Sequence, residues 1–180
     1  MRARFAVLAG LIALPLAAVI YTKAMARLSF GEPPAMAAPD QMADEIRVNK
    51  ARREMVLLRA GAPIARYDIS LGAAPEGHKS REGDERTPEG TYQIDWRNPR
   101  SVGHLSLHIS YPNAQDLAAA EAQNVSAGGD IMIHALPNGW GALGGLHRLW
   151  DWTNGCIAVT NDEMDFIWSH VPNGTKITIE

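Results

Sequence analysis

Two segments in the middle of the chain alternate apolar and polar residues with a period of two. The alternation runs over residues 92–96 and again over 104–109. Successive side chains of a β-strand point to opposite faces of a sheet, so this period is typical of half-buried strands. The pattern therefore predicts a mainly β domain.

Other local signals add strands and two helices to this domain. Four apolar segments bounded by turn residues predict further strands, at 55–58, 64–71, 131–133 and 176–179. Asn113 and Thr160 are each followed three residues later by an acidic residue, which is a helix-capping pattern. With 180 residues the chain fits one such domain, mainly β and with two short helices.

The amino terminus has the layout of an export signal. Arg2 and Arg4 precede an uncharged run over residues 5–21, which Lys23 closes, and small residues follow at 24–26. A positive start, an apolar stretch and a small-residue cleavage site define a secretory signal, although this run is also close to the length of a membrane anchor. We expect residues 1–26 to be a signal peptide or an anchor helix. Cleavage and retention both stay open.

Charge and composition indicate how residues 27–180 are organised and in which compartment they lie. Residues 27–43 are rich in Pro, Ala and Gly and predict a flexible linker before a folded domain at 44–180. Three basic residues and no acidic residue lie in 1–26, so the remainder carries 14 Lys and Arg against 20 Asp and Glu. An acidic exported part would repel nucleic acid. We expect an exported protein, periplasmic or on the outer face of the cytoplasmic membrane, with membrane contact only through residues 1–26 if these are retained.

Cys156 is the one cysteine of the chain, which excludes an intrachain disulfide and a multi-cysteine metal site. A single cysteine between apolar neighbours is often an inert buried residue. In an oxidising compartment, however, a free thiol is exposed to damage, so its presence calls for a function. Cys156 is therefore a candidate nucleophile.

A cysteine nucleophile needs a base, and His134 is the first candidate. It ends the apolar strand predicted at 131–133, which would hold the ring rigidly at the mouth of a loop. His147, within that loop, is the local rival. His104 and His108 lie four residues apart on one strand, roughly 13 Å at 3.3 Å per residue, which is too far for joint metal chelation.

The segment from 135 to 155 is rich in glycine and tryptophan. A loop of this length without regular structure usually serves binding or catalysis. Glycines let backbone amides approach a substrate, and Trp140 and Trp152 would supply apolar walls. The alternative is that a tryptophan fills the core beneath the loop.

The chain resembles the L,D-transpeptidase (YkuD-type) catalytic domain. Five short segments carry the resemblance: 83–84 (GD), 87–92 (TPEGTY), 131–134 (IMIH), 155–157 (GCI) and 174–177 (GTKI). It covers roughly residues 44–180. It implies a β-sandwich of mixed and antiparallel sheets that acts on peptidoglycan stem peptides, with no metal or organic cofactor.

The resemblance also implies roles for individual residues. Cys156 would be the nucleophile, His134 the proton donor and acceptor, and the backbone carbonyl of Ala135 would orient the imidazole. The amide of Gly155 would stabilise the oxyanion. Four side chains would contact substrate: Trp140, Arg148, Trp152 and Asn154.

The family's motif reads Ser-His-Gly-Cys, then an apolar residue and Arg, whereas residues 153–158 read TNGCIA. The missing arginine would bind a substrate carboxylate, and Ala158 cannot; Arg148 or Arg86 are the candidates to replace it.

Three functions remain open. The first is a transpeptidase, with another stem peptide or an anchored protein as acceptor; the second is a hydrolase using the same Cys156–His134 pair; the third is a non-catalytic wall-binding module.

Overall fold

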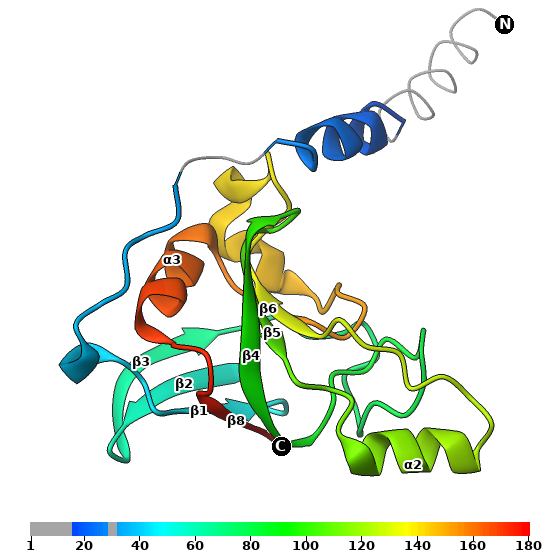
Figure 1. Cartoon of the computed structure of the whole chain (residues 1–180). Helices are drawn as coiled ribbons and strands as arrows, with labels where there is room; N and C mark the ends of the chain where they lie inside the picture. Colours follow the sequence, from blue (N-terminus) through cyan, green and yellow to red (C-terminus); the bar gives the residue numbers. More distant parts are fainter. Residues whose placement is uncertain (1–15, 29–31) are drawn as a thin grey trace, which may run out of the picture.

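Eight strands form one bent, mixed sheet in the order β3-β2-β1-β8-β4-β5-β6-β7 (Figure 1). The structure, a computed structural model, describes residues 16–28 and 32–180. The strands are β1 Glu45–Asn49, β2 Glu54–Arg59, β3 Ala62–Asp68, β4 Gly90–Ser101, β5 His104–Ile109, β6 Met132–His134, β7 Ile157–Ala158 and β8 Lys176–Ile179.

The long strand β4 makes the sheet fold over on itself. Its first residues, from Gly90 to Gln93, pair with β8, and its later residues pair with β5. The register of the second pairing shifts between Ile94 and Trp96, and such an irregularity bends a strand and increases its twist. The predicted β-sandwich of mixed sheets is confirmed: β1–β8 and β6–β7 pair in parallel, and the remaining pairs are antiparallel.

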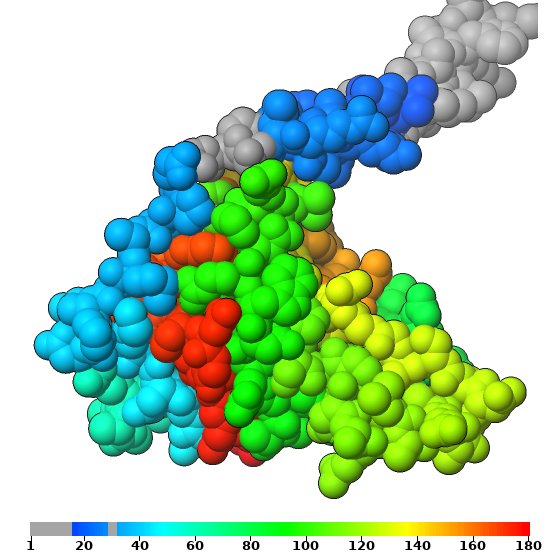
Figure 2. Space-filling model, in the orientation of Figure 1, coloured from blue at the N-terminus to red at the C-terminus, as the bar shows by residue number. Residues whose placement is uncertain are grey.

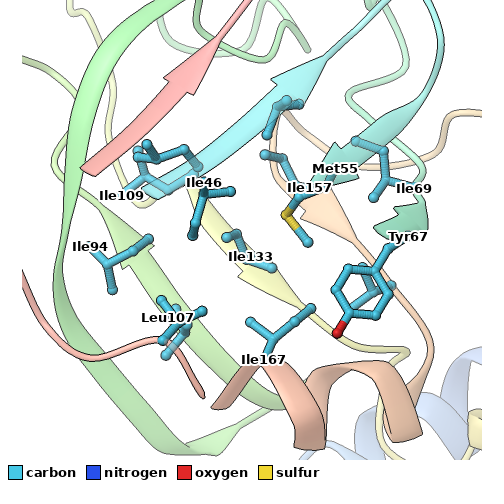
Figure 3. Close-up of a cluster of buried hydrophobic side chains, with 14 of the residues drawn as sticks. Ile46, Met55, Tyr67, Ile69, Ile94, Leu107, Ile109, Ile133, Ile157 and Ile167 are labelled. Atoms are coloured by element: carbon cyan, nitrogen blue, oxygen red, sulfur yellow. The ribbon is translucent and has the colours of Figure 1, made fainter. Parts of the chain in front are cut away.

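One hydrophobic core lies between the two halves of the sheet. Ile46 and Met55 from one half meet Leu107, Ile133 and Ile157 from the other, all with at most 1% of their surface exposed (Figure 3). The alternation that predicted the strands therefore reflects burial on one face of each strand. This core holds β6 and β7 rigidly, and these two strands carry the candidate site.

Both predicted helices are present with their predicted caps. Helix α2 spans Ala114–Ala122 and α3 spans Asn161–His170. The side chain of Asn113 accepts hydrogen bonds from the first turn of α2, and Thr160 and Glu163 cap α3 reciprocally. Two 3₁₀ segments, η1 (Pro39–Gln41) and η2 (Gly141–Leu149), complete the described secondary structure of the domain.

The segment predicted as a linker is attached to the domain over its carboxyl-terminal half. The amides of Ala37 and Ala43 donate hydrogen bonds to the carbonyls of Ser169 and His170, at the end of α3. The last carbonyls of a helix have no intrahelical partner, so they are available to an extended neighbouring chain. Residues 37–43 of the predicted linker are therefore held against the domain by backbone hydrogen bonds.

Residues 16–25 are helical and lie against the residues that follow β6 (Figures 1 and 2). The Tyr21 hydroxyl donates to the Gly139 carbonyl at 3.1 Å, and the Trp140 indole donates to Thr22 Oγ1 at 2.9 Å. Gly139 has a φ of +86°, and a Cβ there would lie 2.8 Å from Met25 Cγ. The predicted apolar run over 5–21 lies in part outside the described residues. No helix within 16–28 and 32–180 is long and apolar enough to cross a membrane.

Candidate active site

The pairing of β6 with β7 places His134 and Cys156 on one face of the sheet. Ile133 pairs with Ile157 and His134 with Ala158, and both isoleucines are fully buried in the core. Side chains alternate along a strand, so His134 and Ala158 point away from that core, and so does Cys156, two residues before Ala158. Residues 22 positions apart in the sequence thus share one surface.

A cleft of about 530 Å³ opens at this surface. Cys156, His134 and Trp152 line it, together with the β4–β5 hairpin. Thr22 and Ala26, from the amino-terminal helical segment, also line the cleft, which lies below the blue helix in Figure 2. The sulfur and the imidazole therefore face a space large enough for part of a peptide, and the N-terminal segment forms one side of it.

The imidazole of His134 is held in one tautomer. Its Nδ1 lies 2.6 Å from the carbonyl oxygen of Ala135, and a carbonyl only accepts, so Nδ1 carries the proton. Nε2 then presents a lone pair, as a general base requires. Burial lowers the pKa of His134, and the hydrogen bond to Ala135 opposes this shift. The ring is therefore neutral at pH 7.

The thiol of Cys156 is also neutral at rest. Burial raises its pKa, and a backbone hydrogen bond from Met132 lowers it by a smaller amount. The thiol donates to the carbonyl of Asp130, with Sγ 3.6 Å from the oxygen. No hydrogen bond joins the sulfur to His134 in the described structure, so the two groups form no thiolate–imidazolium pair there.

These two shifts predict the pH dependence of thiol labelling in the free protein. We expect the rate of Cys156 alkylation by iodoacetamide to rise with pH, with its midpoint above the ordinary cysteine value, because burial favours the uncharged thiol. Stopped-flow labelling between pH 5 and 10 measures it. A plateau already reached below pH 6 would show a preformed thiolate–imidazolium pair and contradict this description.

The amide of Gly155 does not face the cleft as expected. It donates to Thr153 Oγ1 at 3.2 Å, and the Thr153 hydroxyl donates to the carbonyl of Cys156. Gly155 has a φ of +118°, and a Cβ there would lie 2.6 Å from the carbonyl oxygen of Arg86. The glycine therefore serves the tight turn before Cys156, and its amide is already engaged. In the described structure this amide is therefore not free for the oxyanion role expected of it, and that role stays a prediction.

The four residues expected to contact substrate lie in different places. Trp152 lines the cleft, with its ring edge-to-face against His134 at a centroid distance of 5.7 Å. Trp140 instead lines a neighbouring apolar cavity of about 420 Å³, and Asn154 borders a polar cavity of about 590 Å³. Nη2 of Arg148 contacts both carboxylate oxygens of Glu163 of α3 in an ion pair. The structure therefore brings Trp152 into the cleft and leaves the other three outside it.

The segment predicted as an irregular loop over 135–155 contains helical turns. The 3₁₀ segment η2 occupies Gly141–Leu149 and is interrupted at Gly144, where φ is +48° and ψ is −133°. Leu146 and Leu149 are exposed on it, and so is Trp150 directly after it. This correction does not move the site, because no residue of η2 lines the cleft.

The remaining histidines of the middle of the chain have structural partners. His104 pairs with Asp165 and His108 with Asp95, at 2.7 and 2.6 Å. His147, the rival for the base, is 4% exposed and contacts Ser70 through Nδ1. It lines the apolar cavity beside Trp140 and not the cleft with Cys156. The structure therefore favours His134 as the partner of the sulfur.

Sequence reasoning missed the contribution of the β4–β5 hairpin to the cleft. Ser106 of β5 and Arg100 near the end of β4 line the cleft with Cys156. Ser106 lies on the polar face of the predicted strand, so its direction away from the core could have been anticipated. Its position opposite His134 depends on the pairing of β5 with β6, which sequence alone does not give.

Comparison with known proteins gives a consistent picture. Residues 43–179 match the model of the YkuD family, the L,D-transpeptidase catalytic domain. A search of curated proteins gave no match. Among solved structures, the chain is similar to the helical cell shape determining protein Pgp2 from Campylobacter jejuni, with 23% identity, a TM-score of 0.57, and coverage of 88% of this chain and 55% of that one.

Two further structures show the same fold. Bd1075 from Bdellovibrio bacteriovorus is 23% identical, with a TM-score of 0.53 and coverage of 85% of this chain and 53% of that one. An L,D-transpeptidase from Mycobacterium smegmatis is 14% identical, with a TM-score of 0.51 and coverage of 77% and 59%. The present chain thus spans little more than half the length of these proteins.

Proposed function

Because this chain belongs to the L,D-transpeptidase catalytic domain family, we propose that it transfers acyl groups of peptidoglycan stem peptides through a thioester on Cys156. His134 moves the protons, and the reaction takes place outside the cytoplasmic membrane, where the family's peptidoglycan substrate lies. The observation that carries the proposal is the shared cleft of Cys156 and His134, with the imidazole fixed by the Ala135 carbonyl.

The proposed reaction begins from the neutral pair. As Sγ of Cys156 bonds to the carbonyl carbon of the third stem residue, the thiol proton passes to Nε2 of His134. The C–N bond to the terminal D-alanine then breaks, and the same proton leaves Nε2 for the departing amine. The thioester keeps the acyl group activated, so no nucleotide is consumed.

In the second half of the reaction an amine from a neighbouring stem peptide attacks the thioester. His134 takes the proton of the attacking amine and returns it to the sulfur as the C–S bond breaks. The product is a cross-link between two third-position residues. Trp152 walls the cleft beside the imidazole and limits the access of water to it.

A hydrolase is the second candidate, and Ala158 is the observation that favours it. Ala158 pairs with His134 and is fully buried, so the substrate-binding arginine of the family has no counterpart on this strand. If the acceptor peptide binds more weakly, water hydrolyses the thioester in its place. The acyl-enzyme and both catalytic residues are the same in the two cases.

Product analysis tests the proposal. The full chain, purified in detergent, is incubated with defined disaccharide tetrapeptides, and the products are separated and weighed by mass spectrometry. We expect D-alanine release together with dimers cross-linked between third-position residues. Shortened monomers without dimers would assign the chain as a hydrolase instead.

Trapping of the thioester distinguishes the two candidate enzymatic activities, transpeptidase and hydrolase, from a non-catalytic wall-binding module. Acid quenching during turnover should give a protein whose mass increases by the acyl group, located on Cys156 by peptide mapping. Peptidoglycan binding with neither D-alanine release nor an adduct on Cys156 would show that the chain is a non-catalytic module.

A further inference from the structure

The segment η2 presents an apolar surface that the proposed chemistry does not use. Four large apolar side chains on η2 and directly after it are between 40% and 74% exposed: Leu143, Leu146, Leu149 and Trp150. All four line the apolar cavity of about 420 Å³, so they form one contiguous patch, called here the η2 surface. Neither ionisable residue of η2 adds a free charge to it, because His147 is 4% exposed and Arg148 is paired with Glu163. A contiguous apolar patch of this kind marks an interaction site.

The amino-terminal helix over residues 16–25 is fixed against the loop that leads into η2. The rings of Tyr21 and Trp140 meet edge to face at a centroid distance of 5.7 Å. Directly after the helix, the carbonyl of Leu28 accepts a hydrogen bond from Asn138 Nδ2 at 2.8 Å. A Cβ at Gly139 would lie 2.8 Å from the Tyr21 hydroxyl oxygen, so the close approach of helix and loop depends on glycine at this position. The helix therefore packs on the domain as one of its elements.

The side of this helix that faces away from the loop is apolar. Leu16, Val19 and Ile20 are 58%, 51% and 60% exposed, and their spacing of three and four residues places them in one stripe. Thr22, which contacts the loop, lies on the other side, since successive residues of an α-helix are about 100° apart. Lys23 is exposed and continues the stripe. A lysine beside an apolar stripe can extend its ammonium toward the headgroups of a bilayer.

A lipid surface is the partner that these observations favour. The uncharged run over residues 5–21 ends within the helix, so residues 5–15, outside the described structure, lead directly into the apolar stripe. Thr22 lines the same cavity as the η2 surface, and the blue helix and the yellow-to-orange turns of η2 lie at one end of the molecule (Figure 1). Leucine and tryptophan side chains on an uncharged surface suit the boundary between headgroups and acyl chains. Such docking needs no membrane-spanning helix.

We propose that the helix over residues 16–25 stays part of the mature chain and that, together with the η2 surface, it docks the domain on a lipid bilayer. This adds a second membrane contact to the one expected through residues 1–26. Thr22, Pro137 and Trp152 line both the apolar cavity and the cleft that contains Cys156, so docking holds that cleft beside the bilayer. The inference does not rest on the proposed acyl transfer, because lipid contact requires no turnover.

Fluorescence quenching by brominated lipid tests the docking. The full chain is reconstituted into phosphatidylcholine vesicles with and without bromine on the acyl chains, which quenches only those tryptophans that reach the lipid. We expect Trp150→Phe to remove a large part of the quenching seen in the wild type. Trp96→Phe is the matched control, since Trp96 is an exposed tryptophan of β4 that does not line the apolar cavity, and it should leave the quenching unchanged.

The Leu146→Ser/Leu149→Ser variant weakens the η2 surface and keeps Trp150 as the reporter. Both leucines are exposed, so the fold should persist, which circular dichroism checks. We expect the ratio of docked to undocked chains to fall about 10- to 100-fold, because two leucine side chains no longer enter the lipid. Leu117→Ser, on α2 at the opposite end of the molecule, should leave the ratio unchanged. Anionic lipid should not strengthen the quenching, because the η2 surface carries no charge.

Three results would overturn the proposal. Equal quenching in the wild type and in Trp150→Phe would show that the η2 surface does not reach the lipid. An intact mass of the purified chain that lacks residues 1–26 would show that the helix is removed. A cross-linked dimer that disappears in Leu146→Ser/Leu149→Ser, without quenching of Trp150, would assign the surface to a second copy of the chain. D-Alanine release by the same preparations reports separately on the proposed function.

Discussion

Cys156→Ala should reduce D-alanine release from tetrapeptides by at least about a thousandfold, the scale seen when the nucleophile of an acyl-transfer enzyme is removed. Without the sulfur no thioester forms, and the cleft offers no second thiol because the chain has one cysteine. Discontinuous assays with mass detection measure the residual rate. Cys156 is half-buried at the end of a turn, so its replacement by alanine should leave the fold intact, which circular dichroism checks.

His134→Gln is the matched variant for the base. Glutamine keeps a polar side chain in the cleft but cannot accept and return a proton, so we expect a loss of similar size. The two losses should not add in the double variant, because the residues act as one unit. His147→Gln is the control, since His147 lines the neighbouring apolar cavity. A large loss there with little effect at His134 would exchange the roles assigned to the two histidines.

Asp84→Asn should lower the free energy of unfolding by about 3–5 kcal/mol, the usual cost of removing one partner of a buried ion pair. Asp84 lies 2.8 Å from Lys79 Nζ, and the two side chains are 7% and 3% exposed. Burial by itself would raise the pKa of Asp84, but Lys79 and three backbone amides outweigh it and hold the pKa at about 2. The substitution leaves the Lys79 ammonium buried beside a neutral amide. Urea denaturation at pH 7 measures the change.

Glu85→Gln, an exposed acidic residue of the same loop, is the matched control and should change stability by less than about 0.5 kcal/mol. The Lys79→Met/Asp84→Asn double variant should regain part of the loss, because neither charge is then left alone. Equal effects of Asp84→Asn and Glu85→Gln would show that the pair contributes little.

The pH dependence of stability follows from the same shift. The folded pKa of Asp84, about 2, lies below its ordinary value of 3.8. The unfolded chain therefore takes up the proton first as pH falls, and stability that is present above pH 4 is lost as pH falls toward 2. Asp84→Asn should show less of this acid loss than the wild type does.

Local signals predicted the secondary structure well because they depend on near neighbours. The caps at Asn113 and Thr160 satisfy backbone amides within three residues, so tertiary context hardly changes them. The alternation in β4 and β5 predicted strands for the same reason. The 3₁₀ turns of η2 were missed because glycine-rich sequences carry no clear periodicity.

Predictions about single side chains were less secure because their partners come from distant elements. Arg148 was a reasonable candidate to bind a substrate carboxylate, but in the folded chain it forms an ion pair with Glu163 of α3. The amide of Gly155 was a candidate oxyanion donor, but in the folded chain it donates to the hydroxyl oxygen of Thr153. Neither contact has a signature in the sequence around the residue.

The residues alone were enough to predict a β-rich domain with one cysteine, two capped helices and a histidine at the end of a buried strand. These features follow from side-chain periodicity, residue counts and short-range hydrogen bonding. Which groups share the cleft became known from the three-dimensional fold: β6 and β7 pair across 22 residues, and the β4–β5 hairpin brings Arg100 and Ser106 to the far side of His134. Strand register is set by packing of the whole core, and register selects which distant side chains face the same space.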